Sequence, residues 1–185
     1  MDDDEFLFPA TDSDLREVLP RYENYAGVAV CWLLFGSNGH QQRPRGLVTS
    51  NYRNRAAWVD PHVKCIVDPS RVTSPAVGAH AFDCRPGETI VDEKYRPMVG
   101  PFCERPSADV LCVNHYVIKS REEMVRRRTR PKVDGAPNVR TIRQWEDFDA
   151  QYNAVEDLRI QRFTGLTNSS LTFTLSPFAR RSHEP

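Results

Sequence analysis

The chain has 185 residues, enough for one hydrophobic core, and nothing in its composition requires two domains. Its 25 acidic and 25 basic residues balance, so no overall charge points to nucleic acid as a partner. No apolar run reaches membrane-spanning length and no signal segment opens the chain, so we expect it, as written, to be soluble, untargeted and without a membrane segment.

The first residues combine carboxylates with an apolar run. Asp2 and Asp4 are two positions apart, and in an extended or tightly turned segment both can reach one hard cation. The apolar residues 6–8 would then anchor the acidic end in a core. A frayed, solvated acidic end is the alternative interpretation.

Residues 11–13 offer helix-capping side chains, and apolar residues recur at helical spacing over residues 15–22, which predicts a short amphipathic helix. Residues 28–35 are apolar on both alternating faces, as in a strand buried within a sheet. A loop follows, whose glycines permit unusual backbone angles and close approach of a ligand. Its candidate residues are Gly36, Ser37, Gly39 and His40, and a simple turn is the alternative.

Residues 58–67 are expected to form a second strand, with His62 and Lys64 together on the face away from the core. Residues 68–108 are rich in proline and should wrap over a sheet edge, with short strands near 79–82 and 89–91. Residues 110–118 predict a third strand. If it stays extended as far as Lys119, then His115 and Lys119 lie on one side.

Two helices should follow, each opened by a capping box. Ser120 with Glu123 begins the first, which carries the basic residues 126–128 and stops at Pro131. Thr141 with Gln144 begins the second, whose apolar stripe runs over residues 142–155. The tail over residues 164–185 is expected to be loosely ordered, with residues 171–175 as a potential edge strand.

The five cysteines are odd in number and widely spaced, and no two form a C-x-x-C pair. Several lie in apolar, strand-like runs. We therefore expect them to be small buried hydrophobes and not zinc ligands or a disulfide framework.

Several segments together resemble glycosyltransferase family 92 and its close bacterial and algal relatives. The matching stretches, in order, are residues 2–6 (D-x-D-E-F), 32–40 (W-x-x-F-G-S-x-G-H), 62–64 (H-x-K), 114–123 (N-H-Y-x-x-K-S-x-E-E) and 153–157 (N-x-x-x-D). Several motifs in the right order are more specific than any one of them. The resemblance covers residues 1–163 and implies an α/β fold of GT-A type, a mixed sheet with flanking helices.

The resemblance also implies an activity: metal-dependent, inverting transfer of a hexose from a nucleoside-diphosphate sugar to a hydroxyl of a glycan or other acceptor. Asp2, Asp4 and His115 would hold Mn²⁺ or Mg²⁺, with Asp2 also near the donor. Lys119 and the helix start at Ser120 would bind the diphosphate. Residues 36–40 would form an acceptor or donor loop.

Two questions stay open at the level of sequence. The general base for the acceptor hydroxyl is one of Asp60, His62 and His40, which the sequence does not rank. The family's nucleotide-binding half precedes its D-x-D motif, so we expect this chain to be the C-terminal part of such an enzyme, inactive by itself. A non-catalytic fragment or binding remnant is the alternative, and localisation is open: cytoplasmic, or membrane-anchored through a preceding segment.

Overall fold

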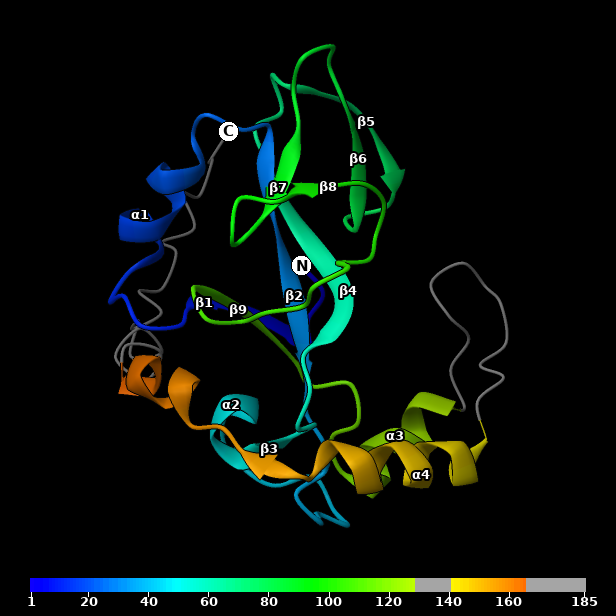
Figure 1. The fold of residues 1–185 in the computed structure, drawn as a ribbon. Helices are drawn as coiled ribbons and strands as arrows, with labels where there is room; N and C mark the ends of the chain where they lie inside the picture. The colour runs from blue at the N-terminus through cyan, green and yellow to red at the C-terminus, as the bar shows by residue number, and fades with distance from the viewer. Residues whose placement is uncertain (129–140, 166–185) are drawn as a thin grey trace, which may run out of the picture.

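Strand β2 (Gly27–Leu34) runs through the middle of a six-stranded mixed sheet, as its apolar residues predict (Figure 1). The computed structural model describes residues 1–128 and 141–165. The other strands of this sheet are β1 (Glu5–Pro9), β4 (Asp60–Val67), β7 (Ile90–Asp92), β8 (Pro97–Met98) and β9 (Leu111–His115). The order is β1-β9-β2-β7-β8, and β4 also pairs with β2. Strands β7 and β9 run parallel to β2, whereas the remaining pairs are antiparallel.

Short elements and helices surround this sheet (Figure 1). They are α1 (Leu15–Val18), η1 (Leu19–Tyr22), α2 (Val48–Asn51), the pair β3 (Asn54–Arg55) and β10 (Val155–Glu156), the hairpin β5 (Val72–Val77) and β6 (Ala81–Cys84), α3 (Arg121–Arg128), α4 (Ile142–Tyr152) and η2 (Arg159–Phe163). Because β2 and β9 are parallel, their carboxyl ends meet at one edge of the sheet. Helices α3 and α4 lie side by side at that edge, packed around Met124 and Trp145.

The predicted first helix forms, but its cap lies one residue later than expected. The side chain of Asp14, not one from residues 11–13, accepts the backbone N–H of Arg16. Pro20 falls in the first turn of η1, where the missing proline N–H costs no hydrogen bond. Val18 and Tyr22 are buried against the sheet, so this segment covers one of its faces.

Both predicted capping boxes are present, but the second helix is shorter than the apolar stripe suggested. Thr141 accepts the N–H of Gln144, whose side chain accepts the Thr141 N–H in return. Helix α4 ends at Tyr152, and Val155 belongs to the two-stranded pair with β3. The stripe predicted over residues 142–155 is therefore not one continuous helix, because the chain leaves the helix at Asn153, its C-cap residue.

Two expectations about strand faces are corrected. Lys64 does not point away from packed residues: it is 5% exposed, because the sheet is covered on both faces at β4. Strand β9 ends at His115, and Lys119 adopts a left-handed backbone angle of +58°. The chain is therefore not extended between these two residues, and they do not form one row.

All five cysteines are free thiols within the described residues, and those on β2 and β9 are buried. Burial raises the pKa of Cys31, Cys65 and Cys112 to about 12, which suits a packing role. No helix in residues 1–128 or 141–165 combines the length and the apolar character needed to span a bilayer. The predicted helix stop at Pro131 and the tail from residue 166 onward lie outside the described residues.

Candidate functional site

Asp4 and His115 meet at the sheet edge where β1 begins and β9 ends. The register pairs Glu5 with His115, and the Tyr116 N–H donates to the Asp4 carbonyl at 2.9 Å. The Asp4 Oδ1 atom consequently lies 3.7 Å from His115 Nε2, and both residues are at most 9% exposed. The structure thus brings together two of the three predicted metal ligands, which are far apart in the sequence.

Asp2, the third predicted ligand, is turned toward a different partner. Its Oδ2 atom accepts a hydrogen bond from Lys64 Nζ at 3.2 Å. Burial raises the pKa of the Asp2 carboxyl, but the hydrogen bond and charge of Lys64 outweigh burial and lower it below its usual value. The same ammonium lies 3.3 Å from Glu5 Oε2, so Lys64 bridges two carboxylates of the acidic segment.

The charges at this edge are unevenly paired. Arg127 from α3 donates to Asp4 Oδ2 at 3.2 Å, so in the described part of the chain the ion pairs of Asp2, Asp4 and Glu5 with basic side chains are those with Lys64 and Arg127. Burial lowers the pKa of His115, against the opposing effect of the Asp4 and Glu5 carboxylates, so the imidazole is neutral near pH 7. Two buried atoms at this edge, Glu5 Oε1 and His115 Nδ1, find no hydrogen-bond partner in the part of the chain that the structure describes.

This edge fits a hard divalent cation in part. A carboxylate oxygen and an imidazole nitrogen that bind one such ion at about 2.1 Å lie roughly 3–4 Å apart, which matches Asp4 and His115. A neutral imidazole is the form that ligates metals. However, no three His, Cys, Asp or Glu side chains converge tightly enough for a metal within the described residues. Asp2 would have to leave Lys64 to complete the shell.

A cavity of about 470 Å³ opens beside this edge, between β2, β4, the segment around Phe102, and helices α3 and α4. His115 and Arg127 form part of its wall, as do Asp60, His62 and the indole of Trp32. The volume is in the range of small-molecule sites. Of the three candidates for a general base, Asp60 and His62 line this cavity, whereas His40 does not.

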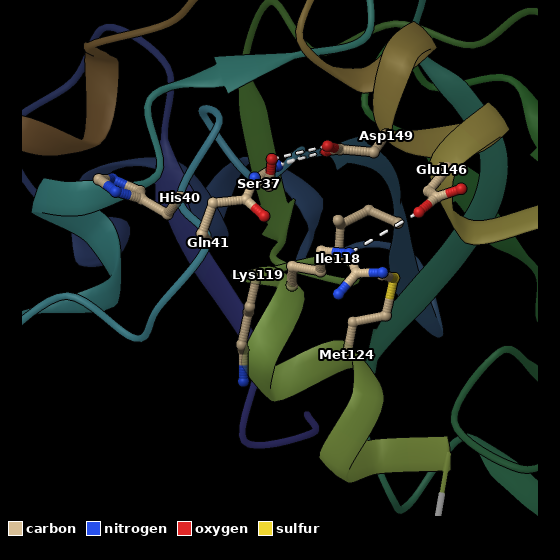
Figure 2. Close-up of a pocket in the computed structure, with 9 residues that line it drawn as sticks. Ser37, His40, Gln41, Ile118, Lys119, Met124, Glu146 and Asp149 are labelled. Atoms are coloured by element: carbon tan, nitrogen blue, oxygen red, sulfur yellow. Dashed lines mark hydrogen bonds and ion pairs between the residues drawn. The ribbon is translucent and has the colours of Figure 1, made fainter. Parts of the chain in front are cut away.

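The loop over residues 36–40 is tied to the end of α4 (Figure 2). The N–H and Oγ of Ser37 both donate to the Asp149 carboxylate at 2.6 Å, and the Asn38 N–H donates to Asn153 Oδ1 at 2.8 Å. His40 Nε2 lies 3.3 Å from the Asn51 carbonyl oxygen. The loop therefore has a structural role of its own, and the predicted acceptor or donor function stays a prediction.

Lys119 and Ser120, the predicted phosphate-binding residues, do not line the cavity that His115 and Arg127 line. Lys119 lines a separate pocket of about 300 Å³ with Ser37 and His40, and Figure 2 shows its side chain directed away from Ser37 and Asp149. The N–H groups that begin α3 are already used by protein acceptors: Ser120 by Tyr52 Oη, Arg121 by the His40 carbonyl, Glu122 by the Gln41 carbonyl and Glu123 by Ser120 Oγ. In this arrangement the helix start offers a phosphate no free donor.

Sequence reasoning missed Arg127 and Glu5 as part of the site. The basic residues 126–128 were predicted only as part of a helix, yet Arg127 lies three residues after the buried Met124 and so shares its side of α3. That helical spacing was the available signal. For Glu5 the signal was its place at the start of an apolar strand, where alternation buries every second side chain.

Gly36 lies so close to Asn153 that a side chain does not fit. A Cβ atom there would approach Asn153 Oδ1 to 2.6 Å, and hydrogen bonds to Asn38 and Asp149 hold that amide in place. We expect Gly36→Ala to lower the free energy of unfolding by about 1–3 kcal/mol, as overpacking does. Urea denaturation measures this.

Gly165→Ala is the matched control, because no atom of the described residues lies within 4 Å of a Cβ built there, whereas Asn153 lies at 2.6 Å from one at Gly36. The double variant Gly36→Ala/Asn153→Ala should lose less stability than the sum of the single changes, because the clash then disappears. Strict additivity would show that contact with Asn153 is not the cause.

Comparison with known proteins does not assign this chain to a family. No protein-family model matches the chain, and no curated protein is significantly similar to it. The relation to glycosyltransferase family 92 therefore depends on the sequence motifs and stays a prediction.

Proposed function

We propose that this chain is part of a GT-A-type glycosyltransferase that uses a divalent metal, Mn²⁺ or Mg²⁺, and a nucleoside-diphosphate sugar as donor. The hexose would pass to a hydroxyl of a glycan or other acceptor, with inversion. The observation that carries this proposal is the pairing of Asp4 with His115 at 3.7 Å beside a cavity of about 470 Å³. The motif order found in the sequence supports the same reaction class.

In this proposal the charged residues at the sheet edge bind the metal ion and the phosphates of the donor. Asp4 and His115 would bind the cation, and Asp2 would join them after release from Lys64. A bound cation would neutralise the negative charge that develops on the departing nucleoside diphosphate. Arg127, which contacts Asp4 at 3.2 Å, would place a further positive charge near the same phosphates.

A second candidate is a non-catalytic binding remnant. The observation that favours it is that Lys64 and Arg127 already pair with the carboxylates that a metal would need. If these cations serve only to neutralise the acidic segment, the sheet edge is a structural ion-pair cluster. The two candidates then differ in whether a metal binds at all.

Calorimetric titration of Mn²⁺, with and without uridine or guanosine diphosphate, tests the proposal. We expect the wild type to bind Mn²⁺ and a diphosphate together. Asp4→Asn and His115→Gln should each weaken Mn²⁺ binding by about tenfold or more, because each removes one ligand.

Asp109→Asn is the control, since its carboxylate is 71% exposed and pairs with the surface residue Lys94. Melting curves without metal would establish that each variant is folded. Equal Mn²⁺ affinity in Asp4→Asn, His115→Gln and Asp109→Asn would reject the proposal and leave the binding remnant.

A further inference from the structure

His62 has the arrangement of a histidine that is oriented by a carboxylate. Its Nδ1 atom lies 2.7 Å from Asp60 Oδ1. Because a carboxylate only accepts, Nδ1 carries the ring proton and donates a hydrogen bond to Asp60. The Nε2 lone pair is then left on the opposite side of the ring. The ring itself lies flat on the Trp32 indole, with centroids 5.1 Å apart and planes inclined by 15°. A carboxylate on one nitrogen and a free lone pair on the other are what a general base requires.

An exposed aromatic ring stands beside His62. Phe102 is 52% exposed, and its ring centroid lies 4.6 Å from that of His62. The backbone holds it there, since the Val63 N–H donates to Pro101 and the Cys103 N–H donates to Pro61. Val77, which is 49% exposed, lines the same cavity, and a cavity lined by apolar and aromatic side chains with a few polar groups is typical of a ligand site. The flat face of Phe102 suits the C–H face of a pyranose.

The donor end and the His62 end belong to one cavity. His115, which meets Asp4, also contacts the Trp32 indole, with ring centroids 4.4 Å apart. Trp32 therefore lies between the predicted metal ligand and the oriented histidine. This juxtaposition is what a transfer reaction needs, because the acceptor hydroxyl must approach the donor sugar from the side opposite its diphosphate.

We infer that this cavity binds the pyranose ring of the acceptor against Phe102, and that His62, oriented by Asp60, is the general base. The inference rests on the proposed function and names its acceptor class and its base. The acceptor oxygen would form a bond to the anomeric carbon as the bond from that carbon to the diphosphate oxygen breaks. The hydroxyl proton would pass to His62 Nε2, and the nucleoside diphosphate would leave with the bonding electron pair.

The sequence left Asp60, His62 and His40 unranked, and the geometry separates them. His40 is outside the cavity, and its Nε2 lies against the Asn51 carbonyl. Asp60 accepts two hydrogen bonds from His62, through the ring and through the backbone N–H at 3.0 Å. Asp60 is therefore a positioning residue, whereas the Nε2 atom of His62 has no hydrogen-bond partner among residues 1–128 and 141–165.

Sugar binding by the full chain tests this inference without requiring turnover. The probes are the methyl glycosides of glucose, galactose and mannose, added to protein with ¹⁵N-labelled histidine and observed by NMR. We expect at least one glycoside to shift the Nε2 resonance of His62 in a saturable way and to leave that of His40 unchanged. Phe102→Ala should weaken this binding by about three- to tenfold, the value of one aromatic contact.

Val99→Ala is the matched control, because Val99 lies in the same segment, is 95% exposed and does not line this cavity. Asp60→Asn should keep sugar binding within about threefold but change the His62 resonances, since the ring loses its anionic partner. If no glycoside shifts His62, or if Phe102→Ala binds as tightly as Val99→Ala, the inference is overturned.

The two proposals fail in different ways. If the chain binds a glycoside but binds neither Mn²⁺ nor a nucleoside diphosphate, the transferase proposal is rejected and the sugar-binding cavity is retained. Mn²⁺ and diphosphate binding without any glycoside effect on His62 would keep the donor site and reject the acceptor site.

Discussion

Lys64→Ala should lower the free energy of unfolding by about 3–5 kcal/mol, the usual cost of removing one partner of a buried ion pair. The Lys64 side chain is 6% exposed and lies 3.3 Å from Glu5 Oε2, and the Glu5 side chain is fully buried. The other carboxylate oxygen, Glu5 Oε1, has no partner. Without the ammonium, the Glu5 charge would remain in the sheet uncompensated, and urea denaturation would measure the loss.

Lys94→Ala serves as the control for losing a lysine. Lys94 pairs with Asp109 at 3.0 Å, but both side chains are largely exposed, so its removal should cost at most about 1 kcal/mol. The double variant Lys64→Met/Glu5→Gln should recover much of the loss, because neither new side chain is charged. Similar costs for Lys64→Ala and Lys94→Ala would contradict the buried pairing.

Asp157→Ala should also cost about 3–5 kcal/mol, because it leaves two arginines without their shared partner. The Asp157 carboxylate accepts hydrogen bonds from Arg55 at 2.7 Å and Arg159 at 2.6 Å, and its side chain is 5% exposed. These bonds connect the β3–β10 pair to η2. Glu156→Ala is the neighbouring control, since that side chain is about half exposed and pairs loosely with Arg53. Equal losses for the two variants would contradict this account.

The same carboxylate predicts a pH dependence. Burial raises the pKa of Asp157, but hydrogen bonds from Arg159 and Arg55 outweigh burial and hold it at about 2, below the ordinary value of 3.8. A lowered pKa in the folded state stabilises the fold fully above the unfolded value, and this contribution is lost as the pH falls from about 4 to about 2. Acid titration of the unfolding free energy should therefore be flatter over that range in Asp157→Asn than in the wild type.

Local patterns predicted much of the secondary structure. The apolar residues of β2 and the capping boxes of α3 and α4 each act within a few residues of backbone, where alternation and helical spacing decide. The end of α4 at Tyr152 was missed because Val155 continues the apolar period, although it pairs with Arg55 in a strand. Pairing with a distant segment outweighed a local preference there.

For the candidate site, some predicted pairs of residues were correct and others were not. Motif order placed Asp4 with His115, and the structure brings them together. The same reasoning placed Lys119 with His115, and the left-handed backbone at Lys119 takes it elsewhere. It also left His62 unranked, because its contacts with Asp60 and Trp32 depend on a bulge in the β2–β4 pairing.

The positions of most strands and helices follow from local sequence, because side-chain alternation and capping are properties of neighbouring residues. Which polar groups meet follows instead from how distant segments pack together. Lys64 neutralises Asp2 and Glu5 across the sheet, 62 positions from Asp2, and Arg127 reaches Asp4 from 123 positions away. Such pairs follow from strand order and helix packing, which bury Asp4 and Glu5 and so require a cation from a segment that lies beside them.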